Sequence, residues 1–297
     1  MENARYIAIA SAVIFAGLFL LERWIPLRVN GQSLWRRLLV NLVVSAIALG
    51  IGVVLIRPSV GYFLERPADQ VGLLNWFTLP QPIEIVIGFM LMDLAFYYWH
   101  LANHRISFLW RFHNVHHIDP DLDVSTAFRF HFGEMVFSVG FRVAQVAVIG
   151  LSPLTYLVYE FVFQANTLFH HSNVRLPIRM ERLLNRVLVT PRMHGIHHSR
   201  VKAEVNSNFS VVLPWWDLMH RTLRLNVPQS QIVIGVPAYS KPEDNHLWNV
   251  LLMPFRKQRD YWGEGISGDQ RVETVGEREA GTCEMPIRRM PERRLAE

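Results

Sequence analysis

The stretch RFHNVHH at residues 111–117 places His113, His116 and His117 within five positions. The stretch RMHGIHHSR at residues 192–200 repeats this H-x-x-H-H spacing about eighty residues later, with a second set of three histidines. A third group, HLANH, ends the apolar run that precedes the first box. Eleven of the thirteen histidines lie between residues 100 and 198, so this part of the chain is a candidate metal site. The histidines of the three groups are His100, His104, His113, His116, His117, His194, His197 and His198.

Long apolar runs surround these histidines. The chain has 297 residues, of which 51% are apolar and 19% charged, and its mean hydropathy of +0.15 is high for a soluble protein. Long uncharged runs alternate with Arg-rich connectors, which is typical of an integral membrane protein. A break at 150–153 (GLSP) favours a helical hairpin in the last run, which also contains Arg142 and Glu160. The first run has the length of a signal peptide, but no clear cleavage site follows it, so we interpret it as a retained anchor. The pattern predicts an all-α, polytopic membrane helical bundle with four to five spans or hairpins, built on the runs Tyr6–Leu21, Leu38–Ile56, Ile85–Trp99 and Met135–Phe169.

Charged connectors predict the orientation. Four arginines lie between the first two runs, and loops rich in Arg face the cytoplasm. From that loop the second run leaves the cytoplasm, the third returns to it, and the hairpin starts and ends there. All three histidine motifs therefore lie on the same side of the membrane. We therefore expect a multi-pass integral membrane protein whose histidine-rich domain faces the cytoplasm. The four arginines are Arg23, Arg28, Arg36 and Arg37.

Composition divides the chain and excludes several classes of protein. The single cysteine, Cys283, excludes a disulfide scaffold and a cysteine-rich zinc site. The net charge of +5 reflects membrane topology and contact with anionic lipid, so no nucleic-acid partner is expected. From residue 255 onward 18 of 43 residues are charged, nine of each sign, which is typical of a solvated, poorly ordered tail. We predict N-terminal transmembrane helices at 1–80, a catalytic domain at 81–225, its extension at 226–254 and the tail at 255–297.

The spacing of the histidines favours metal binding. His100 and His104 are four residues apart, and each H-x-x-H-H box has the spacing i, i+3, i+4, so in a helix each group shares one face. Neutral imidazole is the commonest metal ligand. A catalytic zinc uses about three protein ligands. Eight box histidines exceed what one metal needs, and we expect two metals.

The arrangement H-x3-H, H-x2-H-H and a distant H-x2-H-H beside apolar runs resembles the fatty acid hydroxylase / sterol desaturase superfamily of membrane-bound di-iron oxygenases. The resemblance covers about residues 80–225. It includes RFHFGE at 129–134, with Phe132 where proline is usual, and FHHSNVRLP at 169–177. It also includes NSNFSVVLPWWDLMHRTL at 206–223, with Ser210 where glycine is usual and Met219 and His220 where Phe-Gly is expected.

The resemblance implies that the eight box histidines bind metal and that one of His170 and His171 joins or supports them. The spacing does not decide between these two. Asn166 lies four residues before His170, as a helical partner would. His131 and Glu134 are candidates for supporting the ligands or lining the pocket, or for a purely structural role. Asp93 is an ionisable residue inside a span and therefore a functional candidate, although it can equally bond a buried polar partner.

The expected chemistry is oxidation of a lipid. An unactivated C–H bond requires a metal that activates dioxygen, so we expect two irons per chain and O2 as co-substrate. No Rossmann, haem or iron–sulfur motif occurs, which implies electrons from NAD(P)H through a separate reductase, ferredoxin or cytochrome. The partners expected are therefore a membrane lipid and this electron-transfer protein. Hydroxylation is favoured, and desaturation with the same irons is the main alternative. A membrane zinc hydrolase is less favoured because no H-E-x-x-H occurs, and so is a metal-binding protein, because the histidines gather at the ends of the spans.

Overall fold

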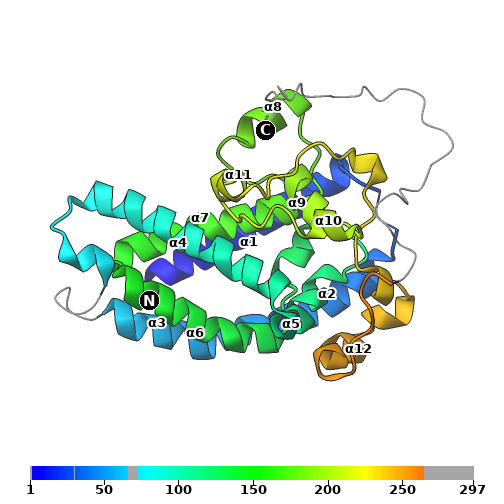
Figure 1. Cartoon of the computed structure of the whole chain (residues 1–297), viewed down its shortest axis with the longest axis horizontal. Helices are drawn as coiled ribbons and strands as arrows, with labels where there is room; N and C mark the ends of the chain where they lie inside the picture. Colours follow the sequence, from blue (N-terminus) through cyan, green and yellow to red (C-terminus); the bar gives the residue numbers. More distant parts are fainter. Residues whose placement is uncertain (1, 30, 66–71, 264–297) are drawn as a thin grey trace, which may run out of the picture.

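The computed structural model describes residues 2–29, 31–65 and 72–263. Within these ranges the protein is helical and contains no β-strand, only two isolated bridges, Pro26 to Val174 and Ser199 to Ile234. The predicted all-α class and the gathering of the histidines are both confirmed. The long helices lie side by side along the longest axis of the molecule (Figure 1).

Five helical units form the long body. Four of them are long and apolar enough to cross a membrane: Arg5–Trp24, Leu34–Leu64, Gln81–Arg105 and Phe132–Ile149. The fifth, α7, completes the hairpin that the sequence predicted. The chain therefore has the helices of an integral membrane protein, at the places where apolar runs occur. Their bounds are α1 Glu2–Trp24, α2 Leu34–Ile51, α3 Arg57–Leu64, α4 Gln81–Arg105, α6 Phe132–Ile149 and α7 Pro153–His171.

The turn between α6 and α7 lies at the predicted break. Gly150 ends α6 with φ +75°, in the left-handed region that glycine tolerates. The hydroxyl of Ser152 accepts a hydrogen bond from the backbone N–H of Thr155, and Pro153 occupies the first turn of α7. Gly72 packs so closely here that a Cβ on it would lie 2.4 Å from Cα of Gly150. The turn reverses the chain, so that the start of α6 and the end of α7 lie toward the same end of the long body (Figure 1).

The second apolar unit is continuous but irregular. A π-helical segment, Gly52–Ile56, joins α2 to α3 within the 31-residue span. Such π segments are rare and often accompany functional sites. Here the segment contributes Gly52 and Ile56 to the wall of the cavity described below.

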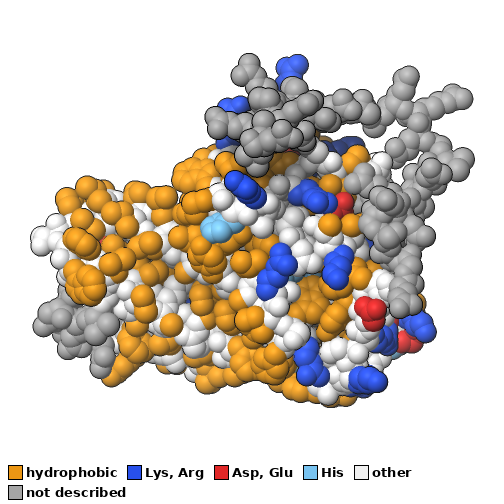
Figure 2. All heavy atoms as spheres, in the orientation of Figure 1, with side chains coloured by type: hydrophobic (Ala, Val, Ile, Leu, Met, Phe, Trp, Pro, Cys, Tyr) orange, Lys and Arg blue, Asp and Glu red, His pale blue; other side chains and the backbone are white. Residues whose placement is uncertain are grey.

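Short helices cover one end of the body (Figure 1). This is the end where α1, α4 and α7 finish and where α2 and α6 begin. Figure 2 shows hydrophobic side chains over the opposite half of the visible face, with Lys, Arg, Asp and Glu gathered at the end with the short helices. The short helices are α5 Ser107–His117, α8 Ile178–Leu184, α9 Pro191–His197, α10 Lys202–Val205, α11 Trp215–His220 and α12 Leu247–Leu252.

The folded body extends past the predicted start of the tail at residue 255. The indole of Trp262 stacks on Trp110, with ring centroids 5.9 Å apart, and Tyr261 packs edge-on against the same ring. Residues 255–263 therefore belong to the packed structure, because they supply aromatic surface to a buried cluster. The rest of the predicted tail, 264–297 with Cys283, lies outside the described residues.

Candidate metal centre

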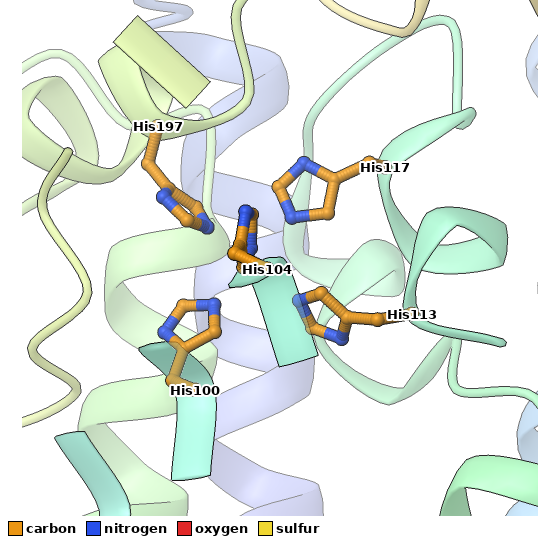
Figure 3. A group of neighbouring side chains, drawn as sticks. All are labelled: His100, His104, His113, His117 and His197. Atoms are coloured by element: carbon orange, nitrogen blue, oxygen red, sulfur yellow. The ribbon is translucent and has the colours of Figure 1, made fainter. Parts of the chain in front are cut away.

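Five histidines form a first group (Figure 3), called here group one. Two come from the C-terminal end of α4, two from α5 and one from α9. One nitrogen atom from each lies within 4.8 Å of the corresponding atoms of the others. Figure 3 shows the imidazole rings surrounding a common centre. Group one consists of His100, His104, His113, His117 and His197.

Four histidines form a second group, called group two. The Nε2 atom of His171 lies 3.0 Å from Nε2 of His116 and 3.0 Å from Nε2 of His194. Nε2 of His194 also lies 3.1 Å from Nε2 of His198. Four imidazole nitrogens therefore converge from α5, α7 and the end of α9.

Each H-x-x-H-H box contributes to both groups. In α5, His113 and His117 belong to group one while His116 belongs to group two. At α9, His197 belongs to group one, whereas His194 and His198 belong to group two. Each box thus supplies ligands to both groups. The motif occurs twice because group one and group two both take histidines from α5 and from α9 with its C-terminal end.

Hydrogen bonds to backbone carbonyls orient three of the rings. The Nδ1–H groups of His100, His197 and His171 donate to the carbonyl oxygens of Phe209, Ser207 and Thr167 at 2.8, 2.7 and 2.8 Å. A carbonyl only accepts, so the proton lies on Nδ1 and the lone pair on Nε2. Metal-binding histidines are typically held this way.

A carboxylate holds a further ring of group one. Nδ1 of His113 lies 2.9 Å from the carboxylate of Glu134, and both side chains are buried. Glu134, predicted as a supporting or pocket residue, thus contacts a box histidine directly. The other nitrogen of His113, Nε2, is buried with no hydrogen-bond partner among the described residues.

Loop 207–210 supplies two of these carbonyl acceptors, and Asp217 holds it. The carboxylate of Asp217 accepts hydrogen bonds from the backbone N–H groups of Phe209 and Ser210, each at 2.8 Å. Asp93 holds the following turn by accepting from the N–H groups of Val212 and Leu213. Asp93 therefore serves a buried structural role and belongs to neither histidine group.

Within the two groups, the imidazole nitrogens have more lone pairs than there are N–H groups to donate hydrogen bonds to them. His171 carries its proton on Nδ1, so its Nε2 can only accept. Nε2 of His194 faces both His171 and His198, and one N–H cannot point at two acceptors. The buried atoms His104 Nε2, His197 Nε2 and both nitrogens of His117 have no partner among the described residues. Such buried polar atoms are costly unless a cation binds their lone pairs.

The spacing of the nitrogens fits a metal ion. A transition metal binds imidazole nitrogen at about 2.0–2.1 Å, which places neighbouring ligand nitrogens about 3.0–3.4 Å apart. The Nε2 separations in group two are 3.0 to 3.1 Å. The ligands are all neutral nitrogen donors, a set that suits iron, copper or zinc. Both groups can therefore hold a metal.

Burial keeps these rings in the form that binds metal. Burial and neighbouring histidines hold the pKa values of His117 and His198 well below the ordinary value, and burial lowers the pKa of His197 to about 3. An imidazole with such a pKa is neutral at physiological pH. Ligation requires a free lone pair, so no proton has to be displaced from the ring.

His171 and His170 have different surroundings, which the spacing could not predict. His171 belongs to group two, whereas His170 belongs to neither group. The ring of His170 packs against that of His194, with centroids 4.1 Å apart, and its Nδ1 lies 3.3 Å from Nδ2 of Asn166. Asn166 also donates to the carbonyl of Val211 at 2.6 Å, so it fixes His170 beside group two.

His131 lies outside both histidine groups. Its Nδ1 accepts from the N–H of Gly133 and caps α6, and its Nε2–H donates to the carbonyl of Leu251. The ring thus connects the start of α6 to the C-terminal segment. Four residues were predicted to support the ligands or line the pocket. Glu134 contacts His113 of group one, and Asn166 contacts His170 beside group two. His131 and Asp93 instead form hydrogen bonds with backbone groups.

A buried ion network beside group two was not predicted. The guanidinium of Arg37 contacts Asp119 at 3.2 Å and also binds Asp123. Arg129, fully buried, lies 3.8 Å from Asp119 and donates to the amide oxygen of Asn41. The network joins α2 to the segment that follows the first box. Its sequence signal was the alternating HHIDPDLD at 116–123, which places three aspartates just after the histidines.

A cavity of about 500 Å³ adjoins both groups. His100 and His113 from group one and His116, His171 and His194 from group two line one end of it. From there it extends between α2, α4, α6 and α7, where its wall is mostly apolar. Arg142 and Glu160, two charges inside predicted spans, also line it. A hydrophobic molecule in this cavity would touch the histidines from the membrane side.

Comparison with known proteins identifies the domain. The fatty acid hydroxylase family profile matches residues 85–222. The ornithine lipid hydroxylase of Rhizobium tropici is 30% identical over 180 residues, which cover 61% of this chain and 51% of that protein. The alkylglycerol monooxygenase of Danio rerio is 30% identical over 222 residues, covering 71% and 43%. Human cholesterol 25-hydroxylase is 31% identical over 145 residues, covering 48% and 51%.

The chain spans about half the length of these relatives. No solved structure matches it. The family match includes HLANH and both H-x-x-H-H boxes. It also includes Glu134, which holds His113, and the loop whose carbonyls orient His100 and His197. By this match and by the curated relatives, residues 85–222 form a domain of the fatty acid hydroxylase family.

Proposed function

We propose that the protein is a membrane-bound oxygenase that hydroxylates a C–H bond of a lipid. The carrying observation is that two groups of buried, neutral histidines adjoin an apolar cavity between the long helices. The curated relatives are named as hydroxylases and a monooxygenase of lipids, which supports the same reaction. Desaturation requires the same metals and remains the second candidate.

The ligands in this proposal are the nine histidines of the two groups. Two irons bound there would activate O2 for insertion of one oxygen atom into the C–H bond. The other oxygen atom leaves as water, with two electrons and two protons drawn from outside. Glu134 holds the ring of His113, and the Ser207 and Phe209 carbonyls hold two more. These contacts keep the lone pairs directed at the metals before substrate enters.

The cavity would position the lipid. Its apolar wall, which includes Trp99 and Phe96 from α4, would bind hydrocarbon and exclude water. Electrons must come from a separate reductase, ferredoxin or cytochrome that draws on NAD(P)H. We propose that this donor binds on the cytoplasmic side, where the short helices cover the histidines.

An isotope experiment tests the reaction. The purified protein, loaded anaerobically with Fe(II), would receive labelled O2, reductant and the lipids of its own membrane. A hydroxylase places one labelled oxygen atom in the product, whereas a desaturase yields an unlabelled product that has lost two hydrogens. Full activity of the His197→Ala variant would remove group one from the proposal. His246→Ala is the matched control, because His246 is exposed and lies outside both groups.

A further inference from the structure

An ion pair lies in the wall of the cavity, between the two helices of the hairpin. Nη1 of Arg142 in α6 donates to Oε1 of Glu160 in α7 at 2.5 Å. Both residues line the cavity, with side chains 11% and 25% exposed. Charged residues inside a membrane span are costly and usually mark a functional site.

Aromatic rings hold the cation in place. The guanidinium carbon of Arg142 lies 4.9 Å from the ring centroid of Phe96 and 5.0 Å from that of Phe163. Cation–π contacts of this kind strengthen when water is excluded. Arg142 is therefore fixed by one carboxylate and two rings before any ligand binds.

Polar side chains continue from this pair along both helices. Ser138 stands one turn before Arg142 on α6, and Tyr156 and Gln164 stand one turn to either side of Glu160 on α7. All of them line the cavity. Two helices that each turn a polar stripe toward the mostly apolar part of a cavity have the composition of a ligand site, in which few polar groups set the orientation.

The ion pair lies at a defined distance from the histidines. Along α6, Arg142 follows Glu134, the partner of His113, by eight residues, which is about 12 Å at about 1.5 Å per residue. Along α7, Glu160 precedes His171 by eleven residues, or about 16 Å. A polar group bound at the pair would thus place hydrocarbon about 12–16 Å away at the metals.

We propose that Arg142 and Glu160 bind an uncharged hydrogen-bonding group of the lipid substrate, such as a hydroxyl or amide. The inference rests on the proposed function and specifies its substrate class. A hydroxyl can accept a hydrogen bond from a guanidinium N–H of Arg142 and donate one to a carboxylate oxygen of Glu160. The contact between Arg142 and Glu160 joins Nη1 to Oε1, and both side chains have further hydrogen-bonding atoms. The pair is neutral as a unit, so it supplies no net charge to balance an ionised head group. Arg57, a further cation in the cavity wall, lies on α3 and is exposed to solvent. The carbon oxidised lies about ten to thirteen C–C bonds from the polar group, at about 1.25 Å per bond.

A binding experiment separates this proposal from the reaction itself. The protein would be loaded with zinc, which imidazole sites accept but which does not activate O2. Equilibrium binding of octadecan-1-ol, octadecanoate and octadecane would then be measured. We expect the alcohol to bind roughly tenfold more tightly than either of the other two, as one or two added hydrogen bonds predict. Equal binding of alcohol and hydrocarbon would overturn the proposal whether or not the iron enzyme oxidises any lipid.

Variants test whether the ion pair is responsible. The double variant Arg142→Met with Glu160→Met keeps side-chain volume and removes both charges, and such replacements often preserve folding. We expect it to lose the preference for the alcohol while still binding octadecane and two zinc ions. If the double variant retains the preference, the pair only joins α6 to α7. Arg259→Gln, which breaks an ion pair with Asp244 remote from the cavity, is the control and should bind all three probes as the wild type does.

With the iron-loaded enzyme, the same proposal predicts the position of the oxygen. Octadecan-1-ol should be hydroxylated within a narrow range of carbons, because the polar group is held at one place. In the double variant the hydroxyl positions should scatter along the chain. A narrow range that is unchanged in the double variant would contradict a role for this pair in positioning.

Discussion

At the scale of single residues, the orientation of each imidazole matters more than its presence. Three backbone carbonyls and one carboxylate fix the Nδ1 atoms of four rings, which directs their Nε2 lone pairs inward. Residue types alone do not reveal this. His170 and His171 are adjacent and chemically identical, yet only His171 has its Nε2 within 3.0 Å of two other imidazoles.

The difference between these neighbours gives a prediction. His171→Ala removes a central member of group two, so bound iron should fall from two per chain toward one. His170→Ala removes a packing contact beside the group, and iron should remain near two. Metal analysis after anaerobic iron loading would measure both, with His246→Ala as the unchanged reference. Equal losses in the two variants would mean that both histidines bind metal.

At the scale of elements, buried charges connect α2 to the segment after the first histidine box. Arg37 is 5% exposed and contacts two buried aspartates, Asp119 and Asp123. Asp119 also accepts from Asn41 and Thr126, so the network spans α2 and residues 119–126. It positions α5, because Asp119 follows His117 by only two residues.

This network predicts different results for adjacent arginines. Arg37→Ala removes the nearest cation from two buried carboxylates and leaves Asp119 with Arg129 at 3.8 Å and Asp123 with Arg23 at 3.4 Å, which should cost about 3 kcal/mol of folding free energy. Arg36→Ala should change stability by less than about 0.5 kcal/mol, because Arg36 is exposed. Thermal unfolding in one detergent would compare them. A mild effect at residue 37, no larger than that at residue 36, would show that the network does not support the fold.

At the scale of the whole molecule, the two ends of the long body differ in what they contain. The short helices cover the histidines at one end of the long body, and the α6–α7 turn closes the other (Figure 1). Two of the four arginines that predicted the orientation, Arg23 and Arg37, form ion pairs with the histidine domain. These contacts place the first connecting loop at the same end as the histidines, as the sequence predicted.

Which side of the membrane this end faces can be measured. After Cys283→Ser, cysteines would be introduced at Lys257, near the histidines, and at Thr78, which precedes α4 at its far end; both positions are exposed. Nineteen residues of α4 separate its start from His100, about 30 Å. An impermeant thiol reagent applied to intact cells should label the cysteine at 78 but not at 257. The reverse pattern would invert the proposed topology.

The sequence by itself determined the helical class, the apolar spans and the histidine boxes that predict a metal site. Apolar runs long enough to span a membrane permit little besides helices, because lipid cannot satisfy backbone groups. The break at Gly150 and Pro153 followed from local backbone preference, and the histidine spacing followed from helical periodicity. All of these are local properties, which is why neighbouring residues suffice to predict them.

Only the tertiary structure decided which residues meet. The contact of His116 with His171 joins residues 55 positions apart, and Arg37 reaches Asp119 across 82. The division of each histidine box between two groups, the exclusion of His170 and the facing of Arg142 and Glu160 into one cavity all depend on how helices pack. Helical periodicity sets which side chains share a face of one helix, but the packing of several helices decides which faces touch, and that packing is a property of the whole chain.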